Sequence, residues 1–365
     1  MAATSRIFNF SAGPAVLPLS ALVRAQRDLL ALPGVGMSVL EISHRSPKFE
    51  EICFGAEADF RKLGGISDDY AVLFLQGGAT LQFSMVPMNL LRTGETADYI
   101  ETGTWSEKAI LEAKKVGRVH VAASSKATNH DRIPAPEELA FSARPAYVHM
   151  TSNNTIFGTQ FAYVPEVPDG VPLVNDASSD IFCRPVDFSR FALTYAGGQK
   201  NLSIAGLTVV VVRRDLLDRA PADVPIYLRY AIHAKERSLY NTPPVFGIYV
   251  LHLVLEHLLE LGGLDELARR NERKAGTLYD AIDGSGGYYR AHARPGSRSL
   301  MNVTFRLPDE EREKRFVKEA TAEGLDGLKG HRSVGGIRAS IYNAFPEAGV
   351  DALVAFMADF QSRNG

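Results

Sequence analysis

Short apolar runs alternate with amphipathic stretches along most of the chain. Turn residues bound seven of these runs, which predict strands at 70–75, 97–102, 119–122, 146–151, 173–176, 192–196 and 207–213. Helical spacing between them predicts helices at 80–91, with a bend near Pro87, at 107–115 and at 136–141. Strands that alternate with helices indicate an α/β domain whose sheet is mostly parallel and covered on both faces.

Further amphipathic stretches lie on either side of these strands. Two helices are predicted at 19–32, with Ser20 as a candidate cap, and at 47–63, with Ser46 as the cap and Pro47 at the first helical position. A long helical pattern over 250–283 pauses at 262–263 and bridges two domains. Beyond it we expect strands at 300–307 and 336–342, a helix at 309–322 and a last helix from about residue 350, which together predict a smaller α+β domain.

Composition narrows the class of protein. The 365 residues are 45% hydrophobic and 22% charged, as in globular proteins, and 40 basic against 42 acidic side chains leave a net charge of −2. Such a balance argues against nucleic acid as a partner. The two cysteines, Cys53 and Cys183, form no CxxC pair, no histidine spacing matches a metal motif, and no run is long enough to span a membrane. We therefore expect a cytoplasmic protein with no metal and no membrane partner.

Lys200 and Asp176 are the first candidates for chemistry. Lys200 follows the strand predicted at 192–196, and Asp176 ends the strand predicted at 173–176. Ligands of α/β sheets bind beyond the carboxyl ends of the strands. Pyridoxal phosphate needs both residue types, because a lysine holds its aldehyde and a carboxylate keeps its pyridine nitrogen protonated. The alternatives are a solvated lysine and an aspartate that caps a turn.

Two other strand ends carry candidate ligand contacts. The segment Gln76-Gly-Gly-Ala-Thr closes one strand and opens a helix, where backbone amides could cradle a phosphate, although a plain tight turn has the same pattern. It matches neither the dinucleotide nor the nucleoside-triphosphate fingerprint. Trp105, the only tryptophan, lies in a strand-end loop, where it could stack on an aromatic ring or belong to the core.

A third group is basic. The chain contains Ser43-His-Arg-Ser and Gly330-His-Arg-Ser-Val-Gly-Gly-Ile-Arg, which supply His44, Arg45, His331, Arg332 and Arg338. Arginine forks suit carboxylate and phosphate groups, so these segments suggest a pocket for a substrate with more than one negative group. The alternative for any one arginine is a surface ion pair.

Together these segments closely resemble the phosphoserine aminotransferase family, a branch of the class V aminotransferases with the fold type I pyridoxal-phosphate architecture. The resemblance extends over nearly the whole chain and is carried by Asn9-Phe-Ser-Ala-Gly-Pro-Ala, Ser43-His-Arg-Ser, Phe74-Leu-Gln-Gly-Gly-Ala, Thr102-Gly-Thr-Trp-Ser, Thr151-Ser-Asn-Asn-Thr-Ile-Phe-Gly-Thr-Gln, Asp176-Ala-Ser-Ser-Asp, Gly198-Gln-Lys-Asn, Tyr240-Asn-Thr-Pro-Pro and the 330–344 segment. It implies a large cofactor-binding domain over 16–265, with a seven-stranded sheet, and a small domain formed by 1–15 and 266–365.

The resemblance also assigns roles to residues. It implies that Lys200 is the catalytic residue and is linked to pyridoxal phosphate, that Asp176 pairs with the ring nitrogen, that Trp105 stacks on the ring and that Thr155 binds the phenolic oxygen. The cofactor phosphate would be bound by residues from both subunits of a homodimer: Gly78, Ala79 and Gln199 from one, Asn241 and Thr242 from the other. Some members have arginine at the position of Ala79.

For the substrate, the resemblance implies that Arg338 holds the α-carboxylate with Ser11 nearby. His44 and Arg45 of one subunit, with His331 and Arg332 of the other, would receive a phosphate or a side-chain carboxylate. The implied reaction is the reversible transamination of 3-phosphooxypyruvate with L-glutamate in serine biosynthesis, with a side activity in pyridoxine biosynthesis on 3-hydroxy-2-oxo-4-phosphonooxybutanoate.

Three other functions compete with this one. The nearest is another enzyme of the same superfamily, such as an alanine–glyoxylate aminotransferase or a cysteine desulfurase. A non-enzymatic binder of phosphorylated metabolites would leave Lys200 and Asp176 without a purpose. An NAD-dependent dehydrogenase lacks its fingerprint here.

Overall fold

All seven predicted strands lie in one sheet of the computed structural model, which describes residues 6–365. The strand order is β2-β10-β9-β8-β5-β3-β4. β10 runs antiparallel to both of its neighbours, and the remaining pairs are parallel. The prediction of a mostly parallel sheet is thus confirmed. Its strands are β2 (Tyr70–Leu75), β3 (Thr96–Glu101), β4 (Arg118–Ser124), β5 (Val148–Thr151), β8 (Leu173–Asp176), β9 (Leu193–Gly197) and β10 (Thr208–Arg213).

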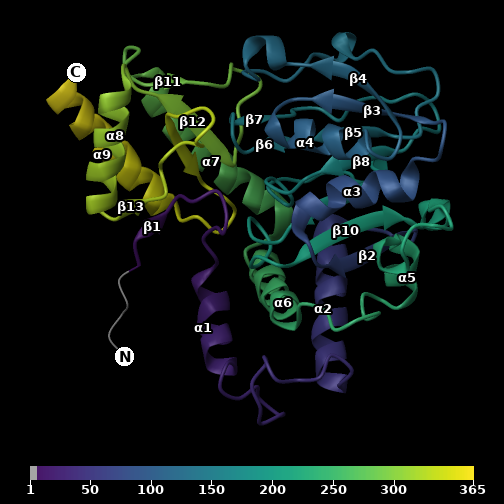
Figure 1. Cartoon of the computed structure of the whole chain (residues 1–365). Coiled ribbons are helices and arrows are strands. Elements are labelled where there is room, and N and C mark those ends of the chain that lie inside the picture. The colour runs from purple at the N-terminus through teal and green to yellow at the C-terminus, as the bar shows by residue number, and fades with distance from the viewer. Residues whose placement is uncertain (1–5) are drawn as a thin grey trace.

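Helices cover both faces of this sheet (Figure 1). On one face α1 (Leu19–Asp28), α2 (Pro47–Gly64) and α6 (Val245–Glu260) pack over Val72 and Val209. On the other, α3 (Gly78–Leu90), α4 (Thr104–Ala113) and α5 (Tyr230–Lys235) pack over Leu73 and Val210. Neighbouring strand residues point to opposite faces, so a strand that is apolar throughout, such as β2, is buried on both sides.

Local signals explain several helix ends. The Ser46 side chain accepts a hydrogen bond from the Phe49 N–H at 3.2 Å at the start of α2, and Gly65 ends that helix in a left-handed conformation. α1 ends at Asp28, four residues earlier than predicted, and the chain that follows contains Gly34 and Gly36 at positive φ. α6 begins directly after Pro244, earlier than the predicted residue 250, and the last helix begins at Glu347.

The prediction of a helix at 136–141 is wrong. Only one 3-10 turn forms, η2 (Pro136–Glu138), and Leu139 is already extended. The Ala140 N–H donates to the Ala122 carbonyl at 2.9 Å, and His120 Nε2 lies 2.8 Å from the Ala140 carbonyl. The segment therefore lies along the edge strand β4, whose free backbone groups compete with a local helix.

The C-terminal part of the chain forms a second core. α7 (Gly263–Asp283), α8 (Glu310–Ala322) and α9 (Glu347–Asn364) pack with an antiparallel sheet of β11 (Arg290–Ala291), β12 (Asn302–Arg306) and β14 (Ile337–Ser340). β1 (Phe8–Asn9) pairs with β13 (Leu325–Asp326), and Phe10 is buried in this core. The predicted division into 16–265 and 1–15 with 266–365 stays a prediction, and its residues 1–5 lie outside the described residues.

The remaining elements are short. A hairpin and four 3-10 turns complete the structure: β6 (Asn153–Asn154), β7 (Thr159–Gln160), η1 (Lys126–Thr128), η3 (Phe188–Arg190), η4 (Arg214–Arg219) and η5 (Ile226–Leu228). Within residues 6–365 no single helix is long and apolar enough to cross a membrane. Only α6 and α7 together reach that length and composition, and they bend by 84° at their junction.

Candidate active site

A cavity of about 300 Å³ lies where the parallel strands end. Nine of the predicted site residues line it: Gly78, Ala79, Trp105, Thr155, Asp176, Gln199, Lys200, His331 and Arg338. They come from positions as far apart as α3 and β14. The cavity has the location that α/β sheets use for ligands, beyond the carboxyl ends of the strands.

Lys200 stands in the turn after β9, inside this cavity. Its Nζ donates a hydrogen bond to Thr155 Oγ1 at 3.1 Å. Burial lowers the pKa of this amine to about 8, and the positive charge of Arg338 acts in the same direction against the carboxylate of Asp176. A substantial fraction of the amine is therefore neutral, and nucleophilic, near physiological pH.

This pKa predicts how the amine reacts in the cofactor-free protein. We expect the rate at which an amine-selective acylating reagent modifies Lys200 to rise with pH through a midpoint near 8, because only the neutral amine is nucleophilic. Peptide mapping at a series of pH values measures that midpoint. Lys318, an exposed lysine on α8, is the internal control, and a common midpoint for the two amines would contradict a depressed pKa.

Asp176 ends β8 and is 3% exposed. Its Oδ1 accepts a hydrogen bond from the Ser178 N–H at 3.0 Å. Burial raises the pKa of this carboxyl, while Ser178, Lys200 and Tyr195 favour its charged form. A cationic N–H on a ligand in the cavity would give this buried carboxylate the partner that it needs.

The start of α3 forms the wall of the cavity that favours an anion. Gly77 and Gly78 adopt φ values of 94° and 66°, and no side chain caps the helix. A Cβ on Gly77 would lie 2.5 Å from Leu81 Cδ2, so the turn needs glycine there. Gly78, Ala79 and Thr80 line the cavity at the positive end of the helix dipole. The turn therefore has the geometry of a phosphate cradle.

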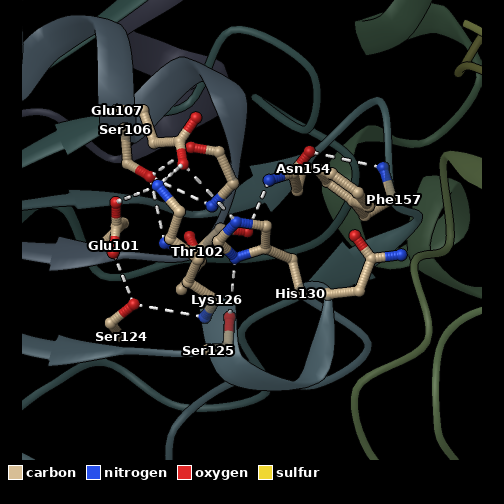
Figure 2. Close-up of polar contacts among 12 residues, drawn as sticks. Glu101, Thr102, Ser106, Glu107, Ser124, Ser125, Lys126, His130, Asn154 and Phe157 are labelled. Atoms are coloured by element: carbon tan, nitrogen blue, oxygen red, sulfur yellow. Dashed lines mark hydrogen bonds and ion pairs between the residues drawn. The ribbon is translucent and has the colours of Figure 1, made fainter. Parts of the chain in front are cut away.

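Trp105 supplies an aromatic wall. It is the second residue of α4, and the Nζ of Lys200 lies 5.8 Å from its ring centroid. The indole Nε1 is buried and has no hydrogen-bond partner. The turn Thr102–Gly103 before this helix is fixed by Ser106 Oγ, which accepts hydrogen bonds from Thr102 N and Gly103 N at 3.0 and 3.1 Å (Figure 2).

Arg338 and His331 bring positive charge from the C-terminal part of the chain. Arg338 lies on β14, its Nε has no partner, and burial lowers its pKa. Burial, with Arg338, Arg332 and Lys108, lowers the pKa of His331. Arg332 lines a neighbouring cavity of about 660 Å³, which His331 also lines. One side of the site is thus electropositive.

The other predicted residues are not among those that line the cavity of this chain. Ser11 precedes the lining residue Ala12, and its N–H donates to Asn9 Oδ1 at 2.9 Å. His44 and Arg45 lie in the turn before α2. Asn241 and Thr242 lie in the segment after α5.

Sequence reasoning missed several lining residues. Two of them, Phe83 and Ile156, are large and apolar, and the others are small or polar: Ala12, Gly13, Thr80, Thr151, Asn153, Ser178, Ser179 and Gly197. Most belong to motifs that carried the family resemblance, but no pattern within those motifs separates the residues that face the cavity from their neighbours.

The cavity holds what pyridoxal phosphate requires. A lysine, a buried carboxylate, an anion cradle at a helix N-terminus and an aromatic face converge in it. No group of three or more His, Cys, Asp or Glu side chains within the described residues could hold a metal ion. The residues therefore fit this cofactor.

Comparisons with known proteins agree with this geometry. The family model described as aminotransferase class-V matches residues 7–353. The chain belongs to this family. It is 56% identical to the phosphoserine aminotransferase of Herpetosiphon aurantiacus over 359 residues, which cover 98% of this chain and 99% of the relative. The corresponding protein of Geobacillus kaustophilus is 55% identical over 358 residues, with 98% and 99% covered.

Solved structures of phosphoserine aminotransferases share the whole fold. The phosphoserine aminotransferase of Bacillus circulans subsp. alkalophilus is 51% identical and superposes with a TM-score of 0.97 over 99% of each chain. A pyridoxal-phosphate-bound phosphoserine aminotransferase from Trichomonas vaginalis is 38% identical, with a TM-score of 0.92, and covers 97% of this chain and 100% of its own. The fold type I assignment is thus confirmed.

Proposed function

We propose that this protein is a pyridoxal-phosphate-dependent phosphoserine aminotransferase, which transfers the amino group of L-glutamate to 3-phosphooxypyruvate and yields O-phospho-L-serine and 2-oxoglutarate. The observation that carries the proposal is the convergence of Lys200 and Asp176 in one cavity with the N-terminus of α3. The high identity to relatives of that name over their full length supports the substrates.

The cofactor contacts follow from the walls of the cavity. Lys200 Nζ would bind the aldehyde, Asp176 would pair with the ring N–H, and Thr155 Oγ1 would bind the phenolic oxygen. Trp105 would stack on the ring. Gly78, Ala79 and Gln199 would bind the phosphate. When bound, pyridoxal phosphate supplies an electron sink for the carbanion at the substrate α-carbon.

Lys200 also moves the proton. With cofactor and substrate bound, the free Nζ of Lys200 would take the α-proton as a general base. The depressed pKa, near 8, keeps enough of this amine neutral to act. Thr155 Oγ1, at 3.1 Å, orients the amine before the substrate arrives.

The basic side chains of the site bind the carboxylate and phosphate groups of the substrates. Arg338 grips the α-carboxylate with Ser11 beside it, since a guanidinium fork matches a carboxylate. His331 and Arg332 of one subunit, with His44 and Arg45 of the other, receive the distal anion. That anion is a carboxylate in the glutamate half-reaction and a phosphate in the other. One basic pocket therefore serves two substrates.

Arg332→Ala should weaken the discrimination between substrates. We expect the ratio of kcat/KM for 3-phosphooxypyruvate over pyruvate to fall by about tenfold or more, because one charge-assisted contact to the phosphate is lost. Steady-state kinetics with both oxo acids measures this ratio. Arg312→Ala is the control, because Arg312 lies on α8 and pairs with Asp309. An unchanged ratio would mean that Arg332 does not contact the phosphate.

We infer that the active unit is a homodimer. Large apolar side chains are exposed on α1 and the loop after it, among them Leu19, Val23 and Leu30 at 59%, 55% and 88%. That loop leads to His44 and Arg45, and the exposed Tyr240 precedes Asn241 and Thr242. His44, Arg45, Asn241 and Thr242 thus lie in segments with exposed apolar side chains. Burial of this apolar surface against a second subunit would place these residues at the cavity of that subunit.

Mixed dimers test this arrangement. When Lys200→Ala and Arg45→Ala chains are co-expressed, a site shared between subunits should be intact once per mixed dimer, which restores about one quarter of the wild-type activity. Lys200→Ala alone should be nearly inactive, and Arg45→Ala alone should be impaired by the loss of one contact to the distal anion. If Arg45 served the site of its own chain, every site in the mixture would be defective, and the activity would not rise above that of the Arg45→Ala chains.

Two features bear on the competing functions and on location. Cys53 and Cys183 are free and buried, and burial raises the pKa of each thiol to about 12. Such thiols are poor nucleophiles, which disfavours a cysteine desulfurase.

Free thiols also suit a reducing compartment, and we propose the cytoplasm.

An absorption spectrum of the purified protein tests the reaction. Glutamate should bleach the yellow band of the bound cofactor, and 3-phosphooxypyruvate should restore it, whereas glyoxylate and pyruvate should not. Restoration by 3-hydroxy-2-oxo-4-phosphonooxybutanoate would extend the activity to pyridoxine biosynthesis. Restoration by glyoxylate alone would favour an alanine–glyoxylate type of enzyme. A protein that gains no band with added cofactor would be a metabolite binder instead.

A further inference from the structure

Two segments from different parts of the chain each contribute a residue to the wall of the cofactor cavity. The turn Thr102–Gly103 joins β3 to α4 and is followed by Trp105 in the first turn of that helix, and the segment after β6 carries Thr155. The side chain of Asn154 connects them (Figure 2). Its Nδ2 donates to the Thr102 carbonyl at 2.5 Å, and its Oδ1 accepts from the Ile156 and Phe157 N–H groups at 3.2 and 3.4 Å.

The contact between these segments is tight. Gly103 has a φ of 151°, and a Cβ built on it would lie 1.6 Å from Asn154 Nδ2. Asn154 itself is 1% exposed, so water does not compete for its amide. Ser106 Oγ holds the same turn from the other side and donates to the Gly103 carbonyl at 2.7 Å. The turn therefore has one well-defined position relative to Asn154.

This geometry couples the two walls that the cofactor ring would touch. Thr155 is the next residue after Asn154 and accepts the hydrogen bond of Lys200 Nζ at 3.1 Å. Trp105 lies in the first turn of the helix that the Thr102–Gly103 turn begins. We propose that Asn154 is a positioning residue, whose amide sets the spacing between the Trp105 ring and the Thr155–Lys200 pair. It touches neither substrate nor cofactor in this role.

The inference rests on the proposed cofactor site, and Asn154→Asp tests it. The substitution keeps the shape and the Oδ1 acceptor, but it places a carboxylate oxygen against the buried Thr102 carbonyl in place of a donor. We expect the dissociation constant for pyridoxal phosphate to rise by about tenfold or more. Because Trp105 is the only tryptophan, the emission maximum of the cofactor-free protein should move as well.

Asn271→Asp is the matched control. Asn271 on α7 is fully buried, and its Nδ2 donates to the Cys183 carbonyl and to Asn343 Oδ1 at 2.8 and 2.9 Å. It bridges two segments in the same manner but is not among the residues that line the cavity. We expect it to lower Tm while the cofactor affinity and the Trp105 emission stay at wild-type values. Asn154→Ser, which removes the bridge without adding a charge, serves if Asn154→Asp does not fold.

The outcomes separate this inference from the proposed function. A shifted emission and a weaker affinity in either Asn154 variant, but not in Asn271→Asp, support the positioning role. Wild-type emission and affinity in the Asn154 variants overturn it, and so does an equal change in Asn271→Asp, which would indicate a general loss of stability. If the wild-type protein itself binds no pyridoxal phosphate, the proposed function fails, and the emission of the cofactor-free protein alone decides this inference.

Discussion

Lys200→Ala should lower kcat for transamination by about a thousandfold or more. The substitution removes both the nucleophile that holds the cofactor aldehyde and the amine that moves the α-proton. Lys200 is the one lysine among the described residues that line the cofactor cavity. Steady-state rates with L-glutamate and 3-phosphooxypyruvate measure the loss.

Two further measurements make this prediction specific. A small primary amine added in solution should recover part of the rate, because the cavity left by the side chain admits an external base. Lys318→Ala, which truncates an exposed lysine on α8, should keep the wild-type rate. A Lys200→Ala enzyme that retained a tenth or more of the wild-type rate would place the base elsewhere.

Asp176→Asn should lower kcat by about a hundredfold or more. The amide has the same shape, but it lacks the negative charge that keeps the ring nitrogen of the cofactor protonated and so sustains the electron sink. The charge of Asp176 also raises the pKa of Lys200. Its removal should therefore shift the acylation midpoint of Lys200 in the cofactor-free protein further below 8, a readout that does not depend on catalysis.

Asp28→Asn provides the comparison for Asp176→Asn. Asp28 is 2% exposed, accepts a hydrogen bond from the Tyr249 hydroxyl at 2.5 Å and lies on α1, on the opposite face of the sheet from α3 and α4. Its loss should cost stability, yet leave kcat and the Lys200 midpoint unchanged. Wild-type catalysis in Asp176→Asn would show that this carboxylate does not serve the cofactor ring.

The fold was largely predictable because its signals are local. Most of the sheet strands contain short apolar runs between turn residues, and burial on both faces, as in β2, makes such runs easy to detect. Ser46 and Pro47 likewise specify the start of α2 within four residues of sequence. The prediction for segment 136–141 was wrong because its backbone bonds to the edge strand β4, and residues 136–141 alone carry no sign of that strand.

The amino-acid sequence by itself determined the strands of the large sheet, the covering helices other than α5, the strand-end positions of Lys200 and Asp176, and the family. Only the tertiary structure decided that Asn154 reaches the Thr102 carbonyl, 52 residues away, and that Arg338 enters the cavity of Lys200. It also decided that the pKa of Lys200 falls to about 8. The reason is physical: patterning and capping act between near neighbours in the chain, whereas desolvation and side-chain bridges depend on distances that exist only after distant segments have packed together.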